Sequence, residues 1–241
     1  GPVYPEGAKT GDFLSRYAGI FPTVELDYTY YQRPTAKRMG AMLEGAGPGL
    51  FSVKAHETLT HKIDPGAWEG EAKAFLEALE PLREAGRLGA ALFQFPYSFH
   101  YEAEQRRYLD KLLGYFAGLP SAVEFRNARW FNTRVIEGLR KREAALVSLD
   151  MPDLRGLPPT LEAVTAPLAY VRLHGRNGKA WWGTDSAARY DYLYSDGELE
   201  AWEGRIRRMA AKADRVLVYF NNHRRGQAVR NGRKLMELLV P

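Results

Sequence analysis

The 241-residue chain is 45% hydrophobic and 26% charged, an ordinary globular composition, and 34 basic against 29 acidic residues give a formal net charge of +5. It contains no cysteine, which excludes disulfides, thiolate catalysis and zinc sites built on sulfur. No apolar stretch approaches the roughly 20 residues that cross a bilayer, and no secretory signal opens the sequence, so we expect a soluble, cytoplasmic protein without a membrane partner.

Seven short apolar runs, each followed by polar side chains, recur along the chain. Most of the intervals between them are long enough for a helix, which predicts an α/β fold with a parallel sheet. In a closed barrel of this kind the carboxyl ends of all strands meet at one face. The runs end at Val24-Glu25, Val53-Lys54-Ala55-His56, Leu92-Phe93-Gln94, Val123-Glu124-Phe125-Arg126, Leu149-Asp150, Val171-Arg172-Leu173-His174 and Phe220-Asn221-Asn222.

Capping residues and helical spacing predict helices in the intervals. The first is capped by Thr10 or Asp12 and ends at Ala18, and another begins near Pro34. We expect Pro81 to kink or break the helix that begins at residue 67. Residues 151–167 carry four prolines and are predicted to be irregular. Further helices are expected over residues 102–116, 133–141, 198–212 and 227–239. No linker interrupts the pattern, so residues 1–241 are predicted to form a single domain.

Three pairs of polar residues stand two positions apart in these endings, so both members of a pair point to the same side of a strand. If that side is the barrel interior, one cavity collects carboxylates, cations and imidazoles. The alternative is an ion-pair lattice that only holds the barrel top, such as Glu124 with Arg172 or Lys54. The pairs are Lys54 with His56, Glu124 with Arg126, and Arg172 with His174.

The candidate catalytic residues are Glu25, Glu124 and His174, as acids or bases. Arg126 would keep Glu124 ionised, and His174 has a side chain that titrates near neutral pH. Each also has a purely structural interpretation: Glu25 as a cap of the next segment, and the histidines as hydrogen-bonded core residues. The neutral groups of Gln94 and Asn221 suit orientation of an amide, sugar hydroxyl or base edge. Lys54, His56 and Asp150 complete the expected ligand-binding set, with Asp150 also able to pair with Arg172.

The cations favour an anionic ligand. Arginine forks bind phosphate or carboxylate in a bidentate manner, and fixed cations such as Arg126 and Arg172 disfavour a resident metal. No cofactor is therefore predicted, with a divalent metal the less favoured alternative. The segment from Asn221 and Asn222 to Arg224 precedes the last helix, where TIM barrels often bind phosphate. The segment 175–195 is long and aromatic, and its Trp182 and Tyr192 either stack on a sugar or base or plug the barrel top.

Basic residues are concentrated in the last quarter of the chain, which leaves a second interpretation open. They include Arg205, Arg207, Arg208, Lys212, Arg215, His223, Arg224, Arg225, Arg230, Arg233 and Lys234. Such clustering is typical of a nucleic-acid or phosphate surface, and equally of a solvated helix face. Two interpretations therefore remain. In the first, the protein binds or processes a small anionic ligand, and if it is an enzyme we expect a hydrolase or lyase that acts on a phosphorylated or glycosidic substrate. In the second, it is a nucleic-acid-binding module without catalysis. No protein partner is inferred.

The spaced motifs together resemble the YecE-like family known as DUF72, a family of unknown function. They include Phe21-Pro22-Thr23-Val24-Glu25, Phe93-Gln94-Phe95-Pro96, Val123-Glu124-Phe125-Arg126 with Trp130-Phe131, Tyr170-Val171-Arg172-Leu173-His174-Gly175 and Tyr219-Phe220-Asn221-Asn222. The resemblance runs from end to end. It implies a TIM-type (β/α)8-like barrel and no established reaction.

The resemblance has one departure. Members of the family open with a strand and a Gly-Thr-Ser-Gly-Trp-like turn before the segment that matches residues 2–7 here. We therefore expect this chain to begin after the family's first strand and to show seven strand endings in place of eight.

Overall fold

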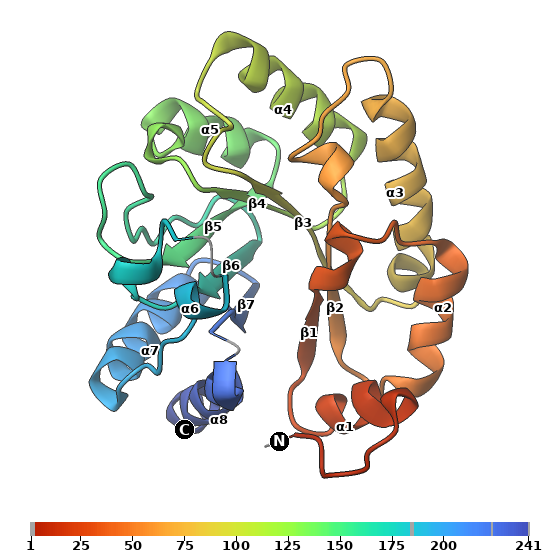
Figure 1. Ribbon diagram of the computed structural model, residues 1–241. Coiled ribbons are helices and arrows are strands. Elements are labelled where there is room, and N and C mark those ends of the chain that lie inside the picture. Colours follow the sequence, from red (N-terminus) through yellow and green to blue (C-terminus); the bar gives the residue numbers. More distant parts are fainter. Residues whose placement is uncertain (1–2, 184–185, 223, 241) are drawn as a thin grey trace.

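The computed structural model of the protein describes residues 3–183, 186–222 and 224–240. Seven parallel strands form one sheet, in sequence order, that curves into a nearly closed barrel (Figure 1). The predicted TIM-type arrangement is therefore confirmed. The strands are β1 (Thr23–Leu26), β2 (Leu50–Lys54), β3 (Leu88–Phe95), β4 (Ser121–Phe125), β5 (Ala144–Asp150), β6 (Leu168–Leu173) and β7 (Arg215–Phe220).

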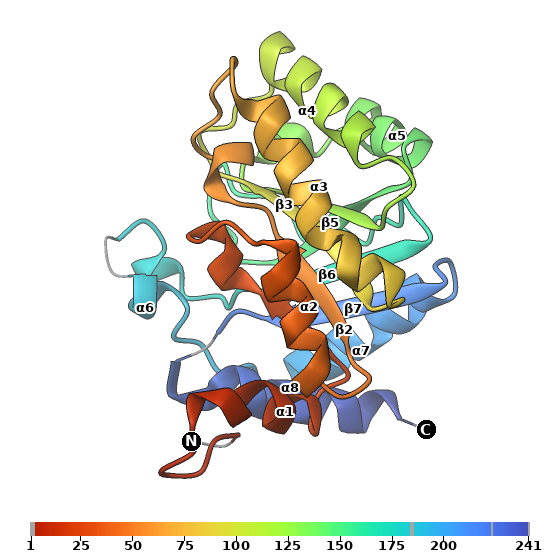
Figure 2. The same ribbon diagram turned by 90° about the vertical axis from the view of Figure 1, so that its right-hand side faces the viewer.

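Helices surround the sheet on its outer side (Figure 2). Residues 151–167, between β5 and β6, contain no helix, as their prolines predicted. No helix in the described ranges is both long and apolar enough to span a membrane. The helices are α1 (Phe13–Ala18), α2 (Ala36–Gly45), α3 (Trp68–Glu84), α4 (Ala103–Tyr115), α5 (Thr133–Lys141), α6 (Ser186–Arg189), α7 (Asp196–Ala210) and α8 (Gln227–Leu239).

Local side-chain caps set several helix starts. The Thr35 hydroxyl accepts from the amide of Arg38 at the start of α2, and Ser195 and Glu198 form a capping box that begins α7. The expected break at Pro81 is wrong, because α3 continues through it to Glu84. Pro81 removes one helical hydrogen bond, and the buried Leu79 and Leu82 hold this part of α3 against the core.

The strand register decides which side chains enter the barrel. Alternate residues face the interior and the helices, and neighbours in register face the same way. Arg172 is in register with Leu149 and Tyr219, and Gln94 with Glu124. The lower interior is apolar, with small residues leaving room for the rings of Tyr170 and Tyr219, 5.1 Å apart. The polar strand endings therefore lie above an apolar floor.

The edges of the sheet are β1 and β7, which are joined by side chains. The Tyr219 hydroxyl lies 2.5 Å from the Thr23 hydroxyl and 2.9 Å from that of Ser52. In Figure 1, α1 and α8 flank these two strands. These interior hydroxyl contacts close the barrel beneath its charged layer.

Candidate functional site

Arg172 on β6 is the centre of a buried charge network. Its guanidinium donates to Glu25 on β1 at 2.5 and 3.0 Å and to Glu124 on β4 at 2.6 Å. The Tyr170 hydroxyl also donates to Glu25, at 2.6 Å. Only 1% of the Arg172 side chain is exposed. Three strands are therefore tied together by one cation and two carboxylates.

Glu124 joins this network to the barrel mouth. Its carboxylate accepts from Arg126 Nε as well as from Arg172, and lies 3.3 Å from His174 Nε2. Burial alone would raise the pKa of Glu124, but the charges of Arg126 and Arg172 hold it well below its usual range. Glu124 therefore remains an anion that fixes Arg126 in place.

His174 is buried beside the same guanidinium, with Arg126 Nη2 3.2 Å from its Nε2. Burial and the charge of Arg126 lower the pKa of His174 to about 3, so the imidazole is neutral at physiological pH. Its Nδ1 is buried and makes no hydrogen bond within the described parts of the chain. The predicted group of Glu124, Arg126, Arg172 and His174 is thus brought together on two strands.

Lys54 is linked to this group through Asp27, which lies 3.8 Å from Arg172 Nη2, whereas His56 has other partners. Lys54 pairs with Asp27 at 2.8 Å and lies over the ring of Tyr30 at 4.7 Å. His56, beyond the end of β2, lies 3.0 Å from the hydroxyl of Thr58, and that hydroxyl donates to Glu71. The charged layer at the barrel top thus contains an ion-pair lattice of the kind considered from the sequence. In this lattice Glu124 pairs with Arg172, whereas Lys54 pairs with Asp27.

A pocket of about 240 Å³ opens beside Arg126 at the mouth. Of the predicted ligand-binding residues, Gln94, Arg126 and Trp182 line it. Its lining contains two guanidinium groups, from Arg126 and Arg189, and no carboxylate. The remaining lining residues are His61, Pro96, Tyr97, Met151, Leu157, Trp181 and Tyr190.

The pKa values of two side chains in the pocket lining are lowered by nearby cations, and Arg126 acts on both. Burial opposes ionisation of the Tyr190 phenol, but the charges of Arg126, Arg172 and Arg189 together outweigh it and lower the pKa of Tyr190. Burial and the charges of Lys54 and Arg126 lower the pKa of His61 to about 4. The pocket therefore presents a neutral imidazole and an acidified phenol near a fixed guanidinium.

The aromatic segment after β6 contributes one wall. Trp181 is buried, whereas 57% of Trp182 is exposed, with its ring 5.2 Å from that of Tyr97. Tyr192 lies elsewhere and donates to Glu198 on α7. Of the two aromatic residues predicted here, Trp182 is at the pocket and Tyr192 packs beside α7.

Asp150 points away from the barrel interior. It is in register with the outward residue Leu173, and it accepts from Arg176 at 2.7 and 2.8 Å and from the indole of Trp202. The expected pair of Asp150 with Arg172 is wrong, because the two side chains leave the sheet on opposite faces. Asp150 instead anchors the start of the aromatic segment to α7.

The segment before α8 is held to that same aromatic segment. Asn222 donates to the carbonyl of Tyr192 at 2.7 Å and to Asn231 at 2.9 Å. Arg224 pairs with Asp191 at 2.9 Å. Asn221 and Glu25 border a different cavity, between β1 and α8. The structure thus separates these residues from the mouth pocket.

Several cations of the last quarter are neutralised by nearby carboxylates. Arg205 and Arg208 both pair with Glu162, and Arg207 pairs with Glu203. His223 lies outside the described residues. Within the described ranges, no group of three histidine, aspartate or glutamate side chains is arranged to hold a metal ion.

Sequence reasoning missed Arg189 and Tyr97 and gave Tyr190 no role. Tyr97 lies two residues after the end of β3, and Arg189 lies in the aromatic segment, so position in the chain was the available signal. Neither residue is part of a strand ending, and only the tertiary structure brings the loop after β3 and the end of α6 to Arg126.

Comparisons with known proteins agree with this architecture. A family model described as "Protein of unknown function DUF72" matches residues 1–241. UPF0759 protein YunF of Bacillus subtilis is 31% identical over 253 residues, covering 98% of this chain and 90% of that protein. The crystal structure of a DUF72 family protein from Thermotoga maritima has a TM-score of 0.89 and 34% identity, with 99% and 93% of the two chains covered. A DUF72 family protein from Enterococcus faecalis has a TM-score of 0.87 and 29% identity, with 94% and 87% covered.

Proposed function

The chain belongs to the DUF72 family, whose description gives no function, and from the mouth pocket we propose that it binds a small ligand with an anionic group and a planar ring or sugar. Nucleotides and sugar phosphates have this chemistry. The observation that carries the proposal is the charge of the lining, which has two guanidinium groups and no carboxylate.

Arg126 is suited to hold the anionic group because its position is fixed before a ligand arrives. Glu124 and His174 occupy its Nε and Nη2, and Nη1 has no partner among the described residues. The Nε of Arg189 is buried and also makes no hydrogen bond there. Two guanidinium groups with unused donors favour a phosphate or carboxylate between them.

The aromatic wall suits the rest of the ligand. Trp182 is exposed at the pocket edge, with its ring nearly perpendicular to that of Tyr97, and its exposed indole is suited to stacking on a planar ring. Gln94 provides an amide donor and acceptor beside it. A planar ring on Trp182 and an anionic group at Arg126 would both fit the lining.

In this proposal Glu124 and His174 position Arg126 rather than exchange protons with the ligand. Glu124 is held ionised and fully buried, and His174 is held neutral beneath the pocket. If the protein also processes its ligand, Tyr190 and His61 are the groups of the lining that can transfer a proton. The roles predicted for Glu25, Glu124 and His174 stay predictions.

Calorimetric titration with AMP, ribose 5-phosphate, adenosine and inorganic phosphate tests the proposal. We expect at least one phosphorylated compound to bind, and Arg189→Gln to weaken that binding about tenfold by removing one guanidinium. Arg16→Gln, an exposed residue of α1, is the matched control and should bind as the unaltered protein does. Failure of both phosphorylated compounds to bind at millimolar concentration would overturn the proposal.

A further inference from the structure

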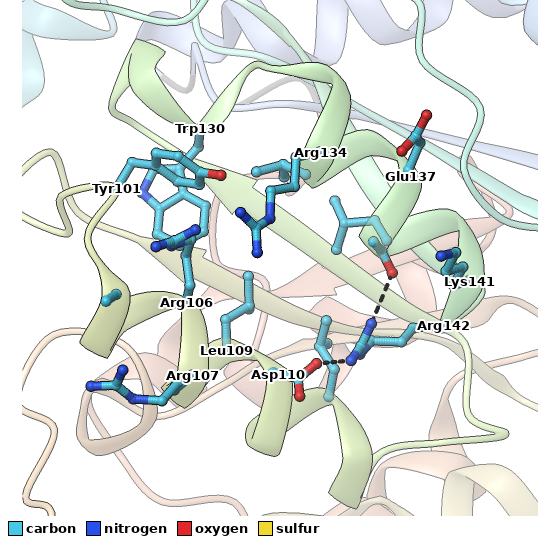
Figure 3. Close-up of a pocket in the computed structure, with 15 residues that line it drawn as sticks. Tyr101, Arg106, Arg107, Leu109, Asp110, Trp130, Arg134, Glu137, Lys141 and Arg142 are labelled. Carbon is cyan, nitrogen blue, oxygen red and sulfur yellow. Dashed lines mark hydrogen bonds and ion pairs between the residues drawn. The ribbon is translucent and has the colours of Figure 1, made fainter.

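A third cavity lies on the outer surface of the barrel, between α4 and α5 (Figure 3). Its volume is about 590 Å³. Neighbouring helices pack directly elsewhere, as α2 does on α3 and α7 on α8, whereas α4 and α5 are separated by this groove. Its floor is apolar and is formed by Leu109, Leu113, Val135 and Leu139, all buried in the barrel's outer core.

The rim of the groove is strongly basic. Five basic and two acidic side chains border it. Figure 3 shows Arg106 beside Tyr101 and Trp130 at one end, Lys141 and Arg142 at the other, and Arg134 between them. An excess of one charge sign around an apolar floor is a feature of surfaces that recognise a partner of the opposite charge.

Two of the five cations are occupied within the chain. Arg142 pairs with Asp110 and donates to the carbonyl of Gly138, and Arg106 lies 5.0 Å from the ring of Tyr101. The other three, Arg107, Arg134 and Lys141, are exposed and have no ion-pair partner among the described residues. Three unneutralised cations therefore remain on both sides of the groove.

We propose that the groove docks an acidic amphipathic segment of a partner protein. Apolar side chains of the segment would lie on the floor between the helices, and its carboxylates would pair with Arg107, Arg134 and Lys141. This is the arrangement by which grooves between helices bind amphipathic peptides. The docking site is separate from the mouth pocket and does not depend on its ligand.

A nucleic acid fits the groove less well. Binding of single strands relies on aromatic rings on which successive bases stack. Trp130 is only 1% exposed, and Tyr101 already lies against Arg106, so neither ring is open for base stacking. The aliphatic floor instead matches leucine-like side chains.

Fluorescence anisotropy with a labelled peptide of repeated Glu-Glu-Leu-Leu units tests the proposal. The variant Arg107→Glu/Arg134→Glu/Lys141→Glu reverses the three cations. The control Arg16→Glu/Lys37→Glu/Lys73→Glu makes the same charge change on exposed residues outside the groove. We expect the groove variant to lose about tenfold in affinity and the control to bind as the unaltered protein does. Circular dichroism confirms that both variants are folded.

Three results would overturn the proposal. Equal losses in the two variants would show attraction by overall charge. Undiminished binding of a peptide with serine in place of leucine would show that the apolar floor takes no part. Tighter binding of single-stranded oligothymidylate, lost in the groove variant, would assign the groove to nucleic acid.

Discussion

Arg172 and Glu124 form an ion pair at the centre of the barrel that is closed to solvent. The two side chains are 1% and 0% exposed, and Arg172 Nη1 lies 2.6 Å from Glu124 Oε2. Burying either charge alone would be costly, so each depends on the other and on Glu25 and Arg126 beside them. This pair links the structural lattice of the barrel to the cation that lines the mouth pocket.

Glu124→Gln should destabilise the protein strongly. Removal of one member of a buried ion pair costs about 3–5 kcal/mol, because the remaining guanidinium groups of Arg126 and Arg172 lose their counterion. Urea denaturation measures this change in the free energy of unfolding. Glu104→Gln, on the exposed side of α4, is the control and should change it by less than about 0.5 kcal/mol. Equal effects of the two substitutions would contradict the assigned network.

Gly175 joins β6 to the aromatic segment, and we expect Gly175→Ala to be more harmful than Gly118→Ala. Both glycines have a left-handed backbone, with φ of +86° and +80°. A Cβ at Gly175 would lie 2.6 Å from Cβ of Tyr192, whereas among the described residues nothing beyond the two chain neighbours lies within 4 Å of a Cβ at Gly118. The extra overpacking should add about 1–3 kcal/mol to the destabilisation. Thermal unfolding of the two variants separates the effect of this clash from that of backbone strain. Equal destabilisation of the two variants would contradict the predicted clash.

Stability should fall with acidification partly through His61. Its pKa is about 4 in the folded protein, below the usual value of 6.5, so the unfolded chain binds the proton more readily. This contribution is fully present above pH 6.5 and is lost as the pH falls from 6.5 toward 4. In His61→Asn the unfolding free energy should decline less steeply across that window. Urea titrations at several pH values measure the slope, and unchanged slopes would show that His61 titrates normally.

Trp182→Ala should separate ligand binding from stability. Since 57% of Trp182 is exposed, its removal should change the unfolding free energy by less than about 0.5 kcal/mol. The binding free energy of a ring-bearing ligand in the mouth pocket should become less favourable by about 1–3 kcal/mol, because stacking on the Trp182 ring is lost. Tyr31→Ala, also exposed but outside the pocket lining, is the control. Calorimetry would contradict the stacking role if the two variants bound a nucleotide equally well.

The strand pattern made the barrel and much of its charged layer predictable. Runs such as Val171-Arg172-Leu173-His174 alternate between apolar and polar side chains, and the two-residue period of a strand places the polar members on one side. This logic predicted that Glu124, Arg126, Arg172 and His174 lie on the same side of the sheet, where the structure has them in contact. It did not locate Asp150, because the end of a run says nothing about which face of the strand its last residue takes.

The sequence by itself determined the alternation of strands and helices, the apolar faces and the polar strand endings, since these depend on local periodicity and on buried apolar surface. Only the tertiary structure decided which carboxylate meets which cation. Partners such as Arg172 and Glu25 are 147 residues apart in the chain, and strand register, not spacing, brings them into contact. The same holds for the mouth pocket, where the loop after β3 brings Tyr97, and the end of α6 brings Arg189, to Arg126.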